Sequence, residues 1–180
     1  MNNSLTERFD EQFVPNTNLE TLKEPLYRRF ITEDAAEDEI EDLLLKRRLL
    51  VKEGQEIRAS VAGILMCHDK PDDYLYNSYI QAVVYRGREK DANDQIDSQN
   101  YTGPLDQQII QTMGFAKRYN AVVAKKDIGR IDIPQYSMRA IFEAILNVCI
   151  EITQKRVLKY VCLCLTTGLN FIPQEHWQIR

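Results

Sequence analysis

The sequence has no apolar run of the roughly 18–20 residues that a membrane-spanning helix requires. The N-terminus, Met1-Asn-Asn-Ser-Leu-Thr-Glu7, also lacks the basic stretch and the apolar stretch that are typical of a secretory signal peptide. We therefore expect a cytoplasmic protein that has no membrane partner and keeps its thiols reduced.

Cysteine and histidine, the common ligands of zinc, are scarce, since the chain has four cysteines and two histidines. Cys162-Leu-Cys164 lies inside an apolar run, and no second cysteine pair follows at the spacing of a zinc site. His176 is twelve residues further along the chain. The sequence therefore predicts no metal site.

Acidic side chains outnumber basic ones, 27 to 23, and the difference is uneven along the chain. Residues 1–147 have a net charge of −6, whereas residues 148–180 have a net charge of +2. Binding to a phosphate backbone relies on clustered lysine and arginine. We therefore expect this chain alone to bind nucleic acid weakly at most.

Apolar periodicity predicts a mixture of helices and strands without a regular strand–helix–strand repeat. Helices are expected at residues 19–30, with Pro25 as an interruption, and at 35–48, 105–119 and 138–147. Strands are expected at 49–55, 80–85, 121–124 and 130–133, whereas 60–68 could be a buried strand or a helix capped by Ser60. The predicted fold class is α+β, with helices packed on a small mixed or antiparallel sheet.

Two features concern the N-terminal third of the chain. Residues 1–18 are polar and irregular, which predicts a linker from something upstream. The order helix, helix, strand-turn near residues 20–60 could form a winged-helix-like element. The second of these helices is rich in Glu and Asp, a poor match for a DNA major groove, so a simple packing pair of helices is the alternative.

Seven stretches along the chain occur in an order and spacing that resemble one family. They are Phe9-Asp-Glu-Gln-Phe-Val-Pro15, Leu26-Tyr-Arg-Arg-Phe30, Ala59-Ser-Val-Ala-Gly-Ile-Leu-Met66, Ile80-Gln-Ala-Val-Val-Tyr-Arg-Gly87, Tyr101-Thr-Gly-Pro-Leu-Asp-Gln-Gln108, Ile133-Pro-Gln-Tyr136 and Ala140-Ile-Phe-Glu-Ala-Ile-Leu-Asn147. Residues 9–147 thereby resemble the middle and C-terminal part of RecG-related proteins, named as ATP-dependent DNA helicases or transcriptional regulators. In full members, the resemblance implies an N-terminal Schlafen/AlbA-like DNA-binding domain and an ATPase module similar to the GHKL type.

The resemblance singles out one pattern that could carry chemistry, Glu143-Ala-Ile-Leu-Asn147. A spacing of four places both side chains on one face of a helix. By resemblance, Asn147 would hold Mg²⁺ beside the phosphates of ATP, and Glu143, the candidate catalytic residue, would orient a water. The alternative is an ordinary amphipathic helix with a solvated Glu143. Its inward residues would be Ile141, Ala144, Ile145 and Val148.

Other parts of a nucleotide-binding enzyme are missing from the sequence. The chain has no G-x-x-x-x-G-K-[ST] phosphate loop and no glycine cluster between a strand and a helix. By resemblance, the DNA-binding domain would lie upstream of Met1, and only the first helix of the ATPase-like module would be present. We therefore expect no cofactor in this chain, and ATP with Mg²⁺ only in intact relatives.

The composition changes after Asn147. No aspartate follows this residue, whereas thirteen precede it, and the only tryptophan, Trp177, lies beyond it. The family resembled here continues with Ala-Val-x-His-Arg-Asp-Tyr, whereas this chain continues with Val-Cys-Ile-Glu-Ile-Thr-Gln. In the neighbouring reading frame, the codons of these residues permit His-Arg-Asp-Tyr. Our hypothesis is that residues 148–180 are a frameshifted tail, which the nucleotide sequence of codons 149–179 would test.

A second interpretation of the tail is a real strand, Val157–Leu165, that packs on the sheet or pairs between chains, and both interpretations can hold together. Three hypotheses for function follow from the sequence. The first is a truncated, non-catalytic fragment that links a DNA-binding domain to a nucleotide-binding module and contacts DNA only through that domain. The second is an ATP- and Mg²⁺-binding domain, and the third is a stand-alone interaction domain that forms a homodimer.

Overall fold

The computed structural model describes residues 8–32, 35–85, 92–120, 122–126, 130–134, 136–154, 161–165 and 169–172. It divides the chain into two compact units. The first holds the chain up to Ser78, residues Thr102–Asp106 and the last residues of the final helix from Ile152. The second holds Tyr79–Tyr101, Gln107–Glu151 and the strands that follow. Helices and mixed or antiparallel strands alternate irregularly, which confirms the α+β class.

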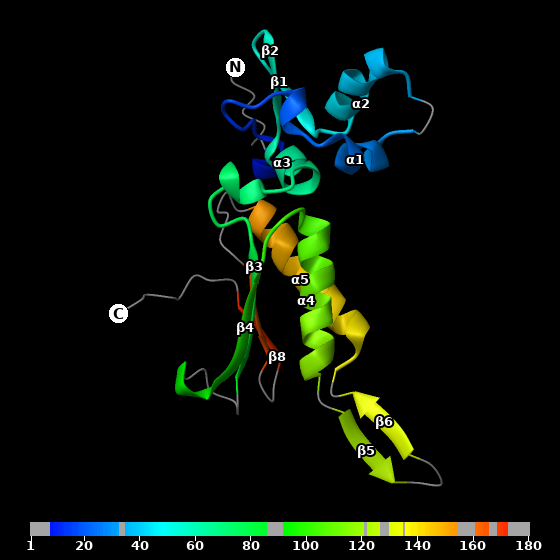
Figure 1. Ribbon diagram of the computed structural model, residues 1–180, viewed down its shortest axis with the longest axis vertical. Helices are drawn as coiled ribbons and strands as arrows, with labels where there is room; N and C mark the ends of the chain where they lie inside the picture. The colour runs from blue at the N-terminus through cyan, green and yellow to red at the C-terminus, as the bar shows by residue number, and fades with distance from the viewer. Residues whose placement is uncertain are drawn as a thin grey trace, which may run out of the picture. The chain divides into compact units, whose positions relative to one another are not determined.

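The first unit is built around a two-stranded antiparallel hairpin, β1 (Leu50–Glu53) and β2 (Glu56–Ala59) (Figure 1). Three short helices accompany it, α1 (Glu24–Tyr27), α2 (Ile40–Lys46) and α3 (Val61–Cys67). Apolar side chains from the helices, the hairpin and the segments between them form one core, which consists of Val14, Leu22, Tyr27, Ile40, Leu44, Leu49, Leu50, Ala59, Val61, Ile64, Leu65, Cys67 and Leu75.

The helix predicted at 19–30 is broken into short pieces. A 3-10 turn at Leu19–Thr21 comes first, α1 follows with Pro25 in its first turn, and a second 3-10 turn spans Arg28–Phe30. Proline is tolerated in a first turn because its missing N–H would have no helical partner there. Pro25 therefore lies at the start of a helix instead of interrupting one.

Part of the segment predicted to be a linker, residues 1–18, belongs to the packed body of the first unit. Val14 and Thr17 are buried, and Phe13 forms an antiparallel bridge with Ser60. The Val14 N–H donates to the Ala59 carbonyl at 2.8 Å, so this segment extends the hairpin sheet. Polar composition alone does not reveal such packing, which among residues 8–18 involves the buried Val14 and Thr17 and the partly buried Phe9.

Ser60 decides the structure of the segment that the sequence leaves open between strand and helix. The fully buried hydroxyl accepts a hydrogen bond from the Gly63 N–H at 2.9 Å, the bond of a helix N-cap. It also donates to the Arg48 carbonyl at 2.6 Å. Ser60 therefore starts α3 and ties it to the chain that enters β1.

Replacing Ser60 by alanine should lower the free energy of unfolding by about 2 kcal/mol, because both bonds are lost inside the core. Ser137 provides the matched control, since its hydroxyl accepts from the Ala140 N–H at 3.1 Å in an exposed position. Ser137→Ala should cost about 1 kcal/mol or less. Urea unfolding followed by circular dichroism measures both. Equal losses would show that the bond to Arg48 contributes nothing.

The second unit contains a four-stranded mixed sheet in the order β4-β3-β7-β8. The central strand β3 (Ile80–Tyr85) pairs antiparallel with β4 (Gln95–Tyr101) and parallel with β7 (Val161–Leu165). The last strand, β8 (Leu169–Ile172), runs antiparallel to β7. Strand β3 agrees with the sequence prediction, and five of its six residues are buried, as expected for an inner strand.

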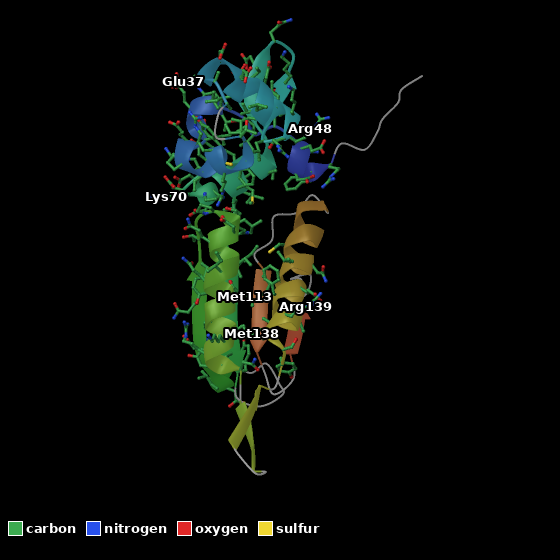
Figure 2. The ribbon with its side chains drawn as sticks, turned by 90° about the vertical axis from the view of Figure 1, so that its right-hand side faces the viewer. Glu37, Arg48, Lys70, Met113, Met138 and Arg139 are labelled. Carbon is green, nitrogen blue, oxygen red and sulfur yellow. The ribbon has the colours of Figure 1, made fainter. Side chains whose placement is uncertain are left out.

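Two helices, α4 (Leu105–Tyr119) and α5 (Met138–Gln154), lie side by side on one face of this sheet (Figures 1 and 2). Between them in the sequence is the predicted strand pair, the antiparallel hairpin β5 (Val122–Lys126) and β6 (Arg130–Pro134), which extends away from the sheet in Figure 1. In the part of the chain that the structure describes, no helix is both long enough and apolar enough to cross a membrane.

The compositional break after Asn147 does not coincide with a structural break. Helix α5 continues to Gln154, and β7 lies beside β3 in the sheet. The strand expected at Val157–Leu165 is therefore present from Val161, while residues 157–160 lie outside the described residues. The frameshift hypothesis concerns the gene and stays a prediction, since an apolar segment of either origin can pair with a strand edge.

Candidate functional site

The start of α5 is held in place by two side chains of the second unit. Asn120, which follows α4, accepts from the Tyr136 N–H at 3.1 Å and donates its amide to the Tyr136 carbonyl at 2.8 Å. Ser137 then caps the first turn of α5 through its bond with the Ala140 N–H. Because Asn120 joins the chain before β5 to the chain after β6, it closes the base of the hairpin and fixes the point where α5 begins.

Helix α5 has one buried face and one exposed face. Ile141 and Ile145 are fully buried and Cys149 is buried one turn further on. Glu143 and Asn147 are both exposed, as their spacing of four on the other side of the helix requires. The structure thus brings the two sequence-predicted site residues together on one accessible surface.

The amphipathic alternative is also consistent with this geometry. Ile141 and Ile145 point inward as that alternative expects, Ala144 is half-buried, and the side chain of Val148 lies outside the described residues. Burial therefore explains Ile141, Ile145 and Cys149, but not Phe142, which is 41% exposed. Burial does not explain why an asparagine stands at position 147, because this residue is exposed.

The carboxylate of Glu143, the candidate catalytic residue, forms an ion pair that the sequence analysis did not predict. Arg139 Nε donates to Glu143 Oε1 at 2.9 Å, and Figure 2 shows Arg139 on the outer side of α5. Both side chains are well exposed, so the pair stabilises the helix by only about 0.3–0.5 kcal/mol. Its spacing of four is a signal that the sequence does contain.

The cysteine thiols that the structure describes are not poised for chemistry. Burial raises the pKa of Cys67 and of Cys149 to about 12, so both remain protonated thiols at neutral pH. Among the described residues, no group of three or more His, Cys, Asp or Glu side chains is arranged to hold a metal ion. The structure does not describe the side chains of Cys162 and Cys164, the pair noted in the sequence analysis.

The carboxylate of Asp97 has a shifted pKa, for a structural reason. The Tyr119 hydroxyl donates to Asp97 Oδ2 at 2.7 Å, which lowers the pKa of Asp97 and raises the pKa of Tyr119. Tyr119 ends α4 and Asp97 lies in β4, so the bond joins the helix to the sheet. We assign this pair a packing role.

Comparison with known proteins gives a likeness of fold. No family model matches the chain, and no curated protein matches it. The crystal structure of the DIP2311 protein from Corynebacterium diphtheriae is similar, with a TM-score of 0.51 and 13% sequence identity. The likeness covers 91% of this chain and 32% of that one, so this chain spans about a third of the length of the DIP2311 protein.

Proposed function

We propose that this chain is a non-catalytic region of a RecG-related regulator, which in intact relatives connects a DNA-binding domain to a nucleotide-responsive module. The observation that supports the proposal is the setting of α5. Glu143 and Asn147 are exposed on one face of this helix. Arg139 already forms an ion pair with Glu143, whose carboxylate would have to orient a water in a catalytic site. Contact with DNA would then be made through the other domain.

A connecting role needs a rigid element, and α5 has the features of one. Asn120 and Ser137 fix its first turn, and Ile141 and Ile145 anchor its inner face in the second unit. A group bound on the outer face would therefore act on a helix that is already attached to the sheet. Closely packed elements move as units because interiors have few voids.

The second candidate function is binding of ATP with Mg²⁺, and the shared exposed face of Glu143 and Asn147 favours it. Mg²⁺ takes one or two protein oxygens and completes its shell with waters and phosphates. The Asn147 side-chain oxygen could serve as such a ligand. The phosphates would need partners besides α5, because the sequence has no phosphate loop.

Titration of the full chain with labelled ATP and Mg²⁺ at millimolar concentration separates the two candidates. The non-catalytic proposal predicts no saturable binding, and no difference between the wild type and Asn147→Ala. The variant should fold normally, since an exposed substitution changes stability by about 0.5 kcal/mol or less.

Saturable binding that Asn147→Ala abolishes would contradict the non-catalytic proposal and support the second candidate. Gln111→Ala, at an exposed position on α4, is the matched control and should bind as the wild type does. Binding lost equally in both variants would show that neither surface is specific.

A further inference from the structure

The first unit contains a hollow of about 590 Å³ between its N-terminal segment and strand β1. The residues that line it are Glu11, Gln12, Phe13, Pro15, Arg48, Val51, Lys52 and Glu53. All of them belong to the same unit, and Figure 2 shows Arg48 near the N-terminal segment. The volume is in the range of sites that hold small molecules.

The acidic and basic groups of this hollow are not equally available. Glu53 Oε2 lies 3.0 Å from Arg58 Nε, and Arg58 also pairs with Glu56. Arg48 and Lys52 are exposed, and neither pairs with a carboxylate within the part of the chain that the structure describes. Glu11 is the other acid in the lining, so the formal charges of the four charged lining residues cancel, and Arg48 and Lys52 are the groups available to an anion.

Apolar groups form the other part of the lining. Phe13 is 40% exposed, which is high for a phenylalanine that also bridges to the hairpin. The Arg58 guanidinium lies 5.9 Å from the centre of its ring and holds one side of it. Val51 and Pro15 complete an apolar surface beside the two cationic side chains.

Arg48 has a backbone conformation that arginine adopts at a cost. Its φ is 60°, and it occupies the position after α2 where the Leu49 N–H bonds to the Leu44 carbonyl at 3.0 Å and the Arg48 N–H to the Leu45 carbonyl at 3.1 Å. This is the helix-ending arrangement in which glycine is the usual residue. The Arg48 carbonyl accepts from the Ser60 hydroxyl at 2.6 Å, so the backbone of this residue serves the fold, whereas its exposed side chain forms no ion pair among the described residues.

We propose that this hollow binds a small organic carboxylate with an apolar body. The Arg48 guanidinium would grip the carboxylate with two parallel hydrogen bonds, and the Lys52 ammonium would add a second charge. The apolar body would lie against Phe13 and Val51. This site belongs to the first unit and is independent of the function proposed for α5.

The proposal is tested with 3-phenylpropionate as the probe, 3-phenylpropionamide as its uncharged counterpart and inorganic phosphate as an anion without an apolar body. Backbone amide signals of the full chain are followed by NMR during each titration. We expect saturable shifts confined to residues 11–15 and 48–53 with 3-phenylpropionate. Binding of the amide should be at least about tenfold weaker, the loss expected for one charge-assisted hydrogen-bond pair.

Arg48→Gly is the decisive variant, because glycine suits a positive φ and the fold should be at least as stable. It should weaken 3-phenylpropionate binding about tenfold. Arg47→Gln, at the adjacent exposed position outside the lining, is the control and should bind within about twofold of the wild type. The proposal is overturned by unchanged affinity in Arg48→Gly, by equal affinity for the amide or phosphate, or by no saturable shift.

Discussion

Replacing Gly63 by alanine should lower the free energy of unfolding of the first unit by about 3 kcal/mol. A Cβ at this position would lie 2.1 Å from the Leu49 carbonyl oxygen and 3.3 Å from Ser60 Oγ. The Leu49 carbonyl cannot move aside easily, because it accepts the Ser60 N–H at 3.1 Å and Leu49 is buried in the core. Helix α3 would have to shift away from the hairpin.

Gly114 in α4 gives the matched control for this substitution. Nothing lies within 4 Å of a Cβ added there, and the position is exposed. Gly114→Ala should therefore raise stability by about 0.5–1 kcal/mol, the usual gain of alanine over glycine inside a helix. Urea unfolding compares both variants with the wild type. A stabilising effect at both positions would show that α3 does not approach Leu49 closely.

Replacing Phe115 by alanine should cost the second unit about 4 kcal/mol. The Phe115 side chain is fully buried, and its ring centre lies 6.5 Å from that of Tyr101 and 4.9 Å from that of Tyr119. Through its contact with Tyr101, it packs α4 against strand β4. Alanine would leave a cavity and remove both ring contacts.

Hydrogen exchange measured by mass spectrometry can locate this loss. Phe115→Ala should speed exchange in β3, β4 and α4, whereas Phe115→Leu should cost about 1.5 kcal/mol and change exchange much less. Gly63→Ala, in contrast, should act first on α3 and the β1–β2 hairpin. Slow exchange in β3 and β4 of Phe115→Ala, equal to that of the wild type, would contradict the assigned role of this residue.

Periodic segments of the sequence predict their own structure. Helix α4 and the helix from Met138 follow from apolar positions at helical spacing, and β3 follows from its continuous apolar run. The pair β5 and β6 follows from two short β-branched stretches around a polar turn. In these cases local preference and tertiary packing favour the same state, so the sequence alone is enough.

Strand β4 is absent from the sequence prediction because its residues, Gln95-Ile-Asp-Ser-Gln-Asn-Tyr101, have no strand pattern. It forms because β3 offers a free edge, and backbone hydrogen bonds do not depend on side-chain type. A different reason explains why the sequence leaves the segment at Ser60–His68 open between strand and helix. A short apolar run suits either state, and the bond between Ser60 and the Arg48 carbonyl, twelve residues earlier, decides for the helix.

The two candidate sites also differ in whether the sequence can predict them. Glu143 and Asn147 are neighbours on one helix, so their spacing in the sequence is enough to place them on one face. The hollow beside β1 joins residues from two segments more than thirty positions apart, which no local pattern brings together.

The sequence by itself determined the α+β class, the long helices and the shared face of the α5 pair, since these depend on spacing along one element. Only the tertiary structure decided the polar strand β4, the continuation of α5 past Asn147 and the hollow at Arg48. These depend on side-chain conformation and on contacts between segments distant in the chain, whose energies the local sequence does not contain.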